Sequence, residues 1–293
     1  MRLAAFEGTH RPLPGISEVA ARRTLVEQMV ESVRRNEYIA VIRTRPCSEL
    51  RLDPSSPMFD PIRAAVLSAN AGDVDEAFWL TFLFVHFGKN MRSGYRLTRD
   101  VYGGLGMFRW NWSKVSSDPL GFRKWLGRNE AEIRSRGGMF GNHRKYQSLS
   151  AWKPAGTGAA VESYVTWVTA GGGHTQLIAD IKSRNSRDRR KTFHELYLRM
   201  SRVTSFGRTA RFDFLTMVGK LGLAEIEPPL AYMQGATGPL EGARLLFGHP
   251  FAAGEAEREV VELERSLKVG MQVMEDSLCN WQKSPSLFIP FRG

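Results

Sequence analysis

Apolar residues recur at intervals of three and four along much of this chain, and this helical spacing limits its fold more than any other feature. The spacing is clearest in the segments 16–33, 73–87, 161–168, 214–221 and 260–278. The alternation typical of β-strands is weak, and its best example, residues 38–43, could equally continue the first helix. We therefore predict a mainly α-helical fold.

Two of these segments predict where a core forms. Residues 74–87 are apolar almost all round, so a helix there, capped by Asp73, belongs in a protein interior. Methionine and leucine residues form a stripe along 260–278, which predicts one long helix that packs on the core through that stripe. The helix over 214–221 is expected to stop at Gly222.

The length of 293 residues allows one large core or two in close contact, and the chain contains no internal repeat. We predict two parts. Residues 1–72 form an N-terminal helical extension packed on the core, and residues 73–293 form a helical catalytic domain that ends in an acidic helix.

The chain is strongly basic, with 41 Lys and Arg against 30 Asp and Glu and a formal net charge of +11. Residues 182–211 contain ten basic and two acidic residues, and residues 89–145 contain thirteen and four, whereas residues 255–276 contain seven acidic and three basic. Either basic block could be a solvated surface, but together they favour a nucleic-acid-binding side and an acidic back. The residues expected to contact a nucleic-acid backbone are Arg187, Arg189 and Arg190.

The two cysteines, Cys47 and Cys279, are too far apart in sequence for a zinc spacing and form no disulfide framework, which fits a reducing compartment. The longest apolar stretch, 77–87, is too short to span a bilayer, and no secretory signal is seen at Met1. We expect a cytoplasmic monomer that binds no membrane, metal or cofactor, in the host cytoplasm if the chain is viral.

The segment 234–244 reads as a glycine hairpin that opens a short helix, with Pro239 in its first turn. A helix start behind a glycine turn presents unpaired N–H groups that attract phosphate. The residues predicted to bind phosphate here are Gln234, Gly235, Thr237, Gly238 and Arg244. The alternative is an ordinary corner between helices that binds nothing.

The loop 137–146 combines three glycines with His143, Lys145 and Tyr146 at the end of the first basic block. Cations, an imidazole and an aromatic ring together suit contact with a nucleotide, although a solvated surface loop would have the same composition. His174 is expected to be a cap or a satisfied polar group rather than a catalyst, and the histidines within helices are expected to be structural.

The segment 205–215 places Asp213 between two phenylalanines and close to Arg208 and Arg211 at a helix start. A carboxylate beside two arginines is a candidate catalytic or ligand-orienting group. Its structural alternative is an internal ion pair with Arg208 or Arg211.

Four motifs in this order resemble the amino acid:DNA transferases of bacteriophages, first described as α-glutamyl/putrescinyl thymine pyrophosphorylases. The motifs are Gly141-Asn-His-Arg-Lys-Tyr146, Gly156-Thr-Gly158, Phe206-Gly-Arg-Thr-Ala-Arg-Phe-Asp-Phe-Leu215, and Gly235-Ala-Thr-Gly-Pro239 with Gly242-Ala-Arg244. The resemblance covers roughly residues 75–250 and implies a helical fold related to helix–hairpin–helix DNA glycosylases, with an extra N-terminal segment and C-terminal helix. The hairpin departs from the Leu-Pro-Gly-Val-Gly type of the glycosylases, and no glycosylase Lys/Asp pair follows it.

The resemblance implies a reaction in which the amine of an amino acid, of the glycine or glutamate type, replaces the pyrophosphate of 5-(pyrophosphoryloxymethyl)uracil in double-stranded DNA. It implies Asp213 or His143 as the base that keeps the amine neutral, and Tyr146 or Trp152 as the ring that stacks on a flipped base. The residues expected to hold the leaving pyrophosphate are Lys145, Arg208, Arg211 and the glycine hairpin. Arg244 or Arg144 would bind the amino acid carboxylate.

Two other classes stay open at this point. A DNA glycosylase or lyase on the same fold would act on a modified base with a water-activating aspartate or a lysine nucleophile. A non-catalytic DNA-binding protein would explain the charge equally well.

Overall fold

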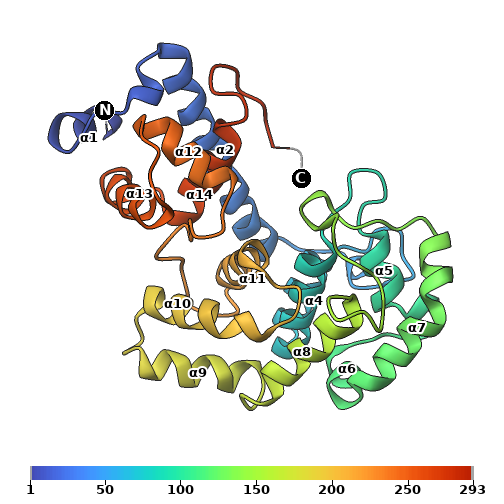
Figure 1. Ribbon diagram of the computed structural model, residues 1–293. Helices are drawn as coiled ribbons and strands as arrows, with labels where there is room; N and C mark the ends of the chain where they lie inside the picture. The colour runs from blue at the N-terminus through green and yellow to red at the C-terminus, as the bar shows by residue number, and fades with distance from the viewer. Residues whose placement is uncertain (1, 292–293) are drawn as a thin grey trace. The chain divides into compact units, whose positions relative to one another are not determined.

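The computed structural model describes residues 2–291 and confirms the mainly α-helical prediction (Figure 1). No β-strand occurs among these residues, only the two isolated bridges Asn90–Gly94 and Ser148–Gly156. The helices are α1 (Arg2–Thr9), α2 (Val19–Thr44), α3 (Pro61–Asn70), α4 (Val74–Phe87), α5 (Arg96–Tyr102), α6 (Trp112–Ser117), α7 (Pro119–Ser135), α8 (Thr157–Thr169), α9 (His174–Arg184), α10 (Arg189–Arg199), α11 (Arg208–Leu221), α12 (Gly238–Phe247), α13 (Ala253–Leu267) and α14 (Met271–Trp281). Short 3₁₀ turns are η1 (Pro14–Ile16), η2 (Glu49–Arg51), η3 (Gly104–Gly106), η4 (Asn142–Arg144) and η5 (Met200–Arg202).

The chain divides into two compact units. Unit 1 contains residues 2–39 and 228–291 of the described chain, and unit 2 contains residues 40–227. The strand alternative for 38–43 is wrong, because these residues belong to α2. The boundary expected at residue 72 falls inside unit 2, between α3 and α4, which pack closely against each other.

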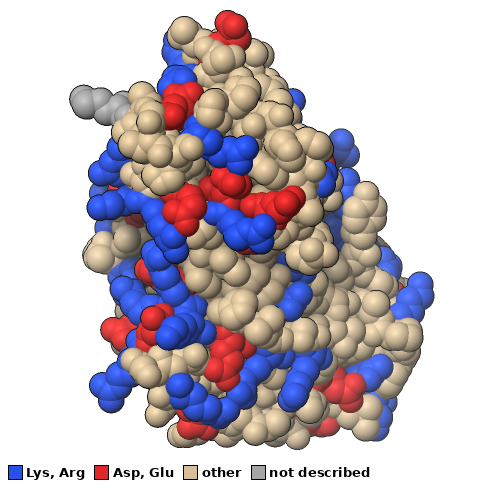
Figure 2. Space-filling model, turned by 60° about the vertical axis from the view of Figure 1, so that its left-hand side comes forward, with Lys and Arg blue, Asp and Glu red and all other residues tan. Residues whose placement is uncertain are grey.

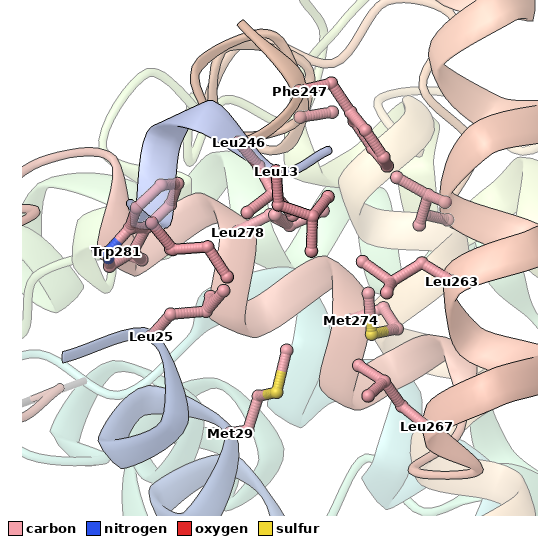
Figure 3. Close-up of a cluster of buried hydrophobic side chains, with 14 of the residues drawn as sticks. Leu13, Leu25, Met29, Leu246, Phe247, Leu263, Leu267, Met274, Leu278 and Trp281 are labelled. Atoms are coloured by element: carbon pink, nitrogen blue, oxygen red, sulfur yellow. The ribbon is translucent and has the colours of Figure 1, made fainter. Parts of the chain in front are cut away.

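Unit 1 is built on a mostly aliphatic core that joins N-terminal and C-terminal segments of the chain (Figure 3). Figure 3 shows Leu25 and Met29 of α2 on the same cluster as Leu263 of α13 and Met274 of α14. The other labelled members of the cluster are Leu13, Leu246, Phe247, Leu267, Leu278 and Trp281, all buried. Unit 1 therefore depends on contacts between residues more than 200 positions apart in the sequence.

The apolar stripe over 260–278 packs into this core as predicted, but the prediction of one long helix is wrong. The chain breaks into α13 and α14 at Lys268 and Gly270, whose φ angles are 54° and 90°. These left-handed conformations end α13 and turn the chain into α14. The whole stripe is still buried, because both helices present their apolar faces to the same cluster.

Unit 2 is centred on α4, which is buried almost all round as the sequence predicts. Asp73 caps α4 by accepting a hydrogen bond from the Glu76 N–H at 3.1 Å. The core around α4 is aromatic: the Phe82 ring lies 4.0 Å from the Tyr164 ring and 4.8 Å from the Phe206 ring. Phe206 directly precedes α11, so this core fixes the helix that carries Asp213.

Candidate functional site

The loop 137–146 is anchored to the carboxyl end of α4. The Gly141 N–H donates to the Phe87 carbonyl at 2.7 Å, and Asn90 Nδ2 donates to the Phe140 carbonyl at 2.9 Å. A Cβ on Gly141 would lie 2.9 Å from the backbone of Lys89. This glycine therefore allows close approach to the chain's own backbone, and the loop is held in place on unit 2.

Arg144 connects this loop to α11. Its side chain is buried; Nε donates to the Val85 carbonyl at 2.7 Å, and Nη2 pairs with Asp213 Oδ2 at 2.8 Å. Charge-assisted hydrogen bonds of this kind orient a carboxylate firmly. The sequence suggested Arg208 or Arg211 as the partner of Asp213 and proposed Arg144 for an amino acid carboxylate. The pairing of Arg144 with Asp213, 69 residues away, left no local signal in the sequence.

Asp213 lies at the surface, although both neighbouring rings are in the core. Phe212 and Phe214 are each 2% exposed, whereas 42% of the Asp213 side chain is accessible. Its position on α11 turns the carboxylate away from the aromatic core and toward solvent. The arrangement is a fixed, accessible carboxylate rather than a buried ion pair.

Three polar or aromatic side chains project from the same loop. His143 and Lys145 are exposed, and the Tyr146 ring is 90% exposed with Lys145 Nζ 5.1 Å from its centre. Trp152 is half-exposed, and the Arg123 guanidinium lies 4.9 Å from its ring. Tyr146 is thus the more accessible of the two rings expected to stack on a base.

Arg208 and Arg211 begin α11 and are only partly exposed. Arg211 Nη1 donates to the Tyr197 carbonyl at 3.1 Å, and its guanidinium lies 4.3 Å from the Tyr197 ring. The Arg208 guanidinium lies 5.8 Å from the Phe212 ring. Both arginines share α11 with Asp213, so unit 2 holds these three side chains and the loop 137–146.

Two histidines of unit 2 are buried and neutral, as expected for structural residues. His86 hydrogen-bonds to Thr157 Oγ1 at 3.0 Å, and burial with the nearby Arg144 charge lowers its pKa to about 3. His174 Nδ1 bonds to Asp75 at 2.6 Å and its Nε2 to the Tyr164 hydroxyl at 2.8 Å, while burial lowers its pKa. The Asp75–His174–Tyr164 chain is inaccessible at Tyr164, so it is a satisfied internal network.

The glycine hairpin 234–244 lies in unit 1. The helix α12 begins at Gly238 with Pro239 in its first turn, as predicted. A Cβ on Gly238 would lie 2.6 Å from Cys279 Sγ, and one on Gly242 would lie 2.3 Å from the Leu278 carbonyl oxygen. Both glycines therefore allow α12 to pack tightly against α14, which is the structural role that the sequence left open.

The other predicted residues of the hairpin have different surroundings. Gln234, Gly235 and Thr237 are exposed, and Gly235 has a φ of 75° that favours glycine. Arg244 Nε donates to the Phe251 carbonyl at 2.9 Å, and its Nη1 pairs with Glu241 at 2.7 Å. Arg244 thus connects α12 to the loop that follows it and pairs with a residue one turn earlier in the same helix.

The turn between α9 and α10 carries the three arginines expected on a nucleic-acid backbone. Arg187 and Arg189 are exposed, and no ion pair involves them within residues 2–291. Arg190 Nε pairs with Glu227 at 2.7 Å. Figure 2 shows blue Lys and Arg side chains beside red Asp and Glu side chains on this face, so the cations are interspersed with carboxylates.

The positive charge of the protein belongs entirely to unit 2. This unit has 29 Lys and Arg against 17 Asp and Glu, a net +12, whereas the described residues of unit 1 have 11 against 13, a net −2. The acidic residues of the C-terminal segment are what neutralise unit 1. A polyanion would therefore be attracted to unit 2, the unit that also holds Asp213 and the loop 137–146.

Two negative findings apply to the described chain. Across residues 2–291 no helix is long and apolar enough to cross a membrane. Within the same residues, no group of three or more His, Cys, Asp and Glu side chains could hold a metal ion.

The comparisons with known proteins give one match. The family model described as Alpha-glutamyl/putrescinyl thymine pyrophosphorylase clade 3 matches residues 20–293. Neither the curated proteins nor the solved structures gave a match. Because the family match spans nearly the whole chain, the protein belongs to the alpha-glutamyl/putrescinyl thymine pyrophosphorylase family, whose name indicates an enzyme that modifies thymine in DNA.

Proposed function

We propose that this protein replaces the pyrophosphate of 5-(pyrophosphoryloxymethyl)uracil in DNA with the amine of an amino acid. Its substrates would be double-stranded DNA carrying the modified uracil and a free amino acid of the glycine or glutamate type. The family supports thymine and pyrophosphate chemistry. The observation that carries the finer proposal is the accessible Asp213 carboxylate, held by buried Arg144 beside a loop of exposed cationic and aromatic side chains.

The reaction forms a bond between the amine nitrogen and the methylene carbon on C5 of the base. It breaks the bond from that carbon to the pyrophosphate oxygen, and the electron pair leaves with pyrophosphate. A base must accept the proton that the nitrogen loses, and Asp213 suits this role because Arg144 fixes its orientation while leaving it accessible. His143, exposed on the neighbouring loop, is the second candidate.

The leaving pyrophosphate gains negative charge as the carbon–oxygen bond breaks, so cations near it would speed the reaction. Lys145, Arg208 and Arg211 are the candidates in unit 2. Lys145 is exposed, and no ion pair involves it among the described residues. The two arginines are partly committed to Tyr197 and Phe212, which fixes their direction rather than removing their charge.

The C5 substituent of the base faces the major groove, and in our proposal the enzyme flips the base out of the duplex so that the reacting carbon enters the site. Tyr146 is the preferred stacking ring because it is 90% exposed and has Lys145 beside it. Trp152 is the alternative, with one side already against Arg123. Arg187, Arg189 and Arg190 on the α9–α10 turn would contact the DNA backbone.

In this proposal, fewer residues of the unit 1 hairpin are assigned to phosphate binding than its sequence suggested. Gly238 and Gly242 are explained by packing against α14. Phosphate binding would then rest on the exposed Gln234, Gly235 and Thr237, and on the N–H groups at the start of α12. Thr237→Ala tests this role without altering the packing: we expect slower transfer with an unchanged melting temperature.

The decisive experiment incubates the protein with pyrophosphorylated-base duplex DNA and one amino acid at a time, then digests the DNA to nucleosides for mass spectrometry. The expected product is a nucleoside with the amino acid on the C5 methylene, together with one released pyrophosphate. Metal chelation should leave the yield unchanged if no cofactor takes part, and analytical ultracentrifugation should show a monomer.

The same experiment separates the alternatives. A glycosylase or lyase would leave an abasic site and release the free base. A non-catalytic DNA-binding protein would bind the duplex and return the substrate nucleoside. Either result would refute the transferase proposal.

A further inference from the structure

Unit 2 has a second group of cationic side chains, separate from those of the loop 137–146, α11 and the α9–α10 turn. A pocket of about 420 Å³ is formed by η2, the start of α3, the segment 89–95 and α5. Its cationic lining residues are Arg51, Arg63, Lys89, Arg96 and Arg99, and Asp60 is the acidic one. Five cations converge here on one concave surface from four separate segments.

The one carboxylate in the lining, that of Asp60, already has hydrogen-bond and ion-pair partners within the protein. Asp60 Oδ1 accepts from the N–H groups of Ile62 and Arg63 at 3.0 and 3.1 Å, which caps α3. Asp60 Oδ2 pairs with Arg63 Nη1 at 2.6 Å. Asp60 therefore offsets one of the five positive charges, and Asp100, which pairs with Arg99, offsets another, so an excess of about three remains.

Three of the remaining cations, Arg51, Lys89 and Arg96, are oriented by neighbouring groups but not neutralised by a carboxylate, whereas Arg99 pairs with Asp100. Arg51 Nη1 donates to the Met58 carbonyl at 3.0 Å and Arg96 Nη1 to the Arg136 carbonyl at 2.8 Å. Each guanidinium has five N–H donors, so one such bond leaves most of them for a ligand. Lys89 Nζ lies 5.6 Å from the Tyr95 ring and, among the described residues, has no carboxylate partner. Arg99 Nε is 3.7 Å from Asp100.

We propose that this pocket binds a compact phosphate-type polyanion, with free pyrophosphate as its ligand. Like charges held together in a concave site repel one another until an anion of several charges binds, and guanidinium groups match phosphate oxygens in geometry. A concave site favours a compact anion over an extended backbone. A phosphate of the DNA backbone has the same chemistry, so the experiment must distinguish the two sources.

The pocket borders the loop that carries the candidate active site. The Met139 N–H donates to Ser93 Oγ at 3.1 Å, and Gly141 packs on the backbone of Lys89. Segment 89–95 thus contacts both the pocket and the loop 137–146. In the proposed reaction the pocket would receive the released pyrophosphate; this link rests on the proposed function, whereas binding of pyrophosphate does not.

The test is isothermal titration calorimetry of the full chain with inorganic pyrophosphate, with orthophosphate as the smaller anion and an unmodified DNA duplex in a separate titration. The double variant Lys89→Gln/Arg51→Gln removes two lining charges. The matched control, Arg92→Gln, removes an exposed cation from the same segment that does not line the pocket. Thermal unfolding of each variant checks that unit 2 stays folded.

We expect the wild type to bind pyrophosphate more tightly than orthophosphate. The double variant should bind pyrophosphate at least tenfold more weakly than the wild type, and Arg92→Gln should bind it as the wild type does. The affinity for the DNA duplex should be similar in all three proteins. Three results would overturn the proposal: no binding of pyrophosphate by the wild type, an equal loss in Arg92→Gln, or a loss of duplex affinity in the double variant without any change in pyrophosphate binding. Because no transfer is measured, failure here leaves the proposed function to its own test.

Discussion

The two units of this protein differ in the composition of their cores and in their net charge. Unit 1 is nearly neutral, with a core that is mostly aliphatic and contains four aromatic side chains, Phe6, Phe247, Phe251 and Trp281. Unit 2 has a net charge of +12, six of the seven tryptophans, and an aromatic core that buries the neutral His86 and His174. The excess positive charge and the proposed catalytic side chains therefore occur together in unit 2, whereas Gly238 and Gly242 of unit 1 serve packing.

The largest effect should be on DNA affinity. With six to ten phosphate contacts, affinity should fall on the order of a thousandfold between low and moderate salt. Changing Arg187, Arg189 and Arg190 together to Glu should weaken binding strongly. The same change of charge in unit 1, at Arg23, Arg258 and Lys268, should weaken it much less. Fluorescence anisotropy with a labelled duplex at several salt concentrations measures the salt dependence and the affinities of the variants. An equal loss of affinity in the two triple variants would contradict the assignment of DNA binding to unit 2.

The next effect concerns Asp213. Asp213→Asn keeps the shape of the side chain and removes the base, so transfer should slow at least about a hundredfold, while binding of modified DNA stays normal. Single-turnover kinetics with the pyrophosphorylated duplex measures the rate. His143→Gln is the parallel variant: a normal rate for Asp213→Asn with a slow His143→Gln would assign the proton transfer to the histidine. An unfolded Asp213→Asn protein would instead mean that the pair with Arg144 is structural.

A third effect tests the packing of unit 1. Gly242→Ala places a methyl group 2.3 Å from the Leu278 carbonyl oxygen, so it should destabilise the protein by roughly 1–3 kcal/mol. Gly254→Ala is the matched control, because a Cβ there meets nothing within 4 Å in α13. Urea unfolding measures both variants. A Gly242→Ala protein as stable as the control would contradict the close contact of α12 with α14.

A fourth effect, similar in size to the third, is the acid sensitivity of unit 2. His86 has a folded pKa of about 3 and an ordinary unfolded pKa of 6.5, so its contribution to stability is present above pH 6.5 and is lost as the pH falls toward 3. At pH 5 the loss from this one group is about 2 kcal/mol. His174 adds to it in the same direction. The histidines of unit 1, His10 and His249, are exposed.

Thermal unfolding followed by tryptophan fluorescence should therefore show a lower melting temperature at pH 5 than at pH 7.5, since most tryptophans report on unit 2. In His86→Gln the amide can still hydrogen-bond to Thr157, and the difference between the two pH values should shrink. An unchanged difference in that variant would assign the acid sensitivity to other groups.

From the sequence alone one could predict the helical class, the position of Pro239 in the first turn of α12, the cap of α4 at Asp73, the stop of α11 at Gly222 and the burial of the 260–278 stripe. These features depend on neighbours within one or two helical turns, and side-chain spacing and capping chemistry are visible over that range. The relation to helix–hairpin–helix glycosylases stays a prediction, as does the assignment of individual catalytic roles.

Which distant segments meet became visible in the three-dimensional structure. The structure joins residues 2–39 to α12–α14, pairs Arg144 with Asp213, breaks the last predicted helix at Lys268–Gly270, and gathers cations from residues 51–99 into one pocket. Each of these results depends on how helices pack through their apolar faces, and periodicity shows that a face is apolar without showing which other face covers it. For the same reason the sequence predicted a turn at the glycines of the hairpin but did not show that two of these glycines contact α14.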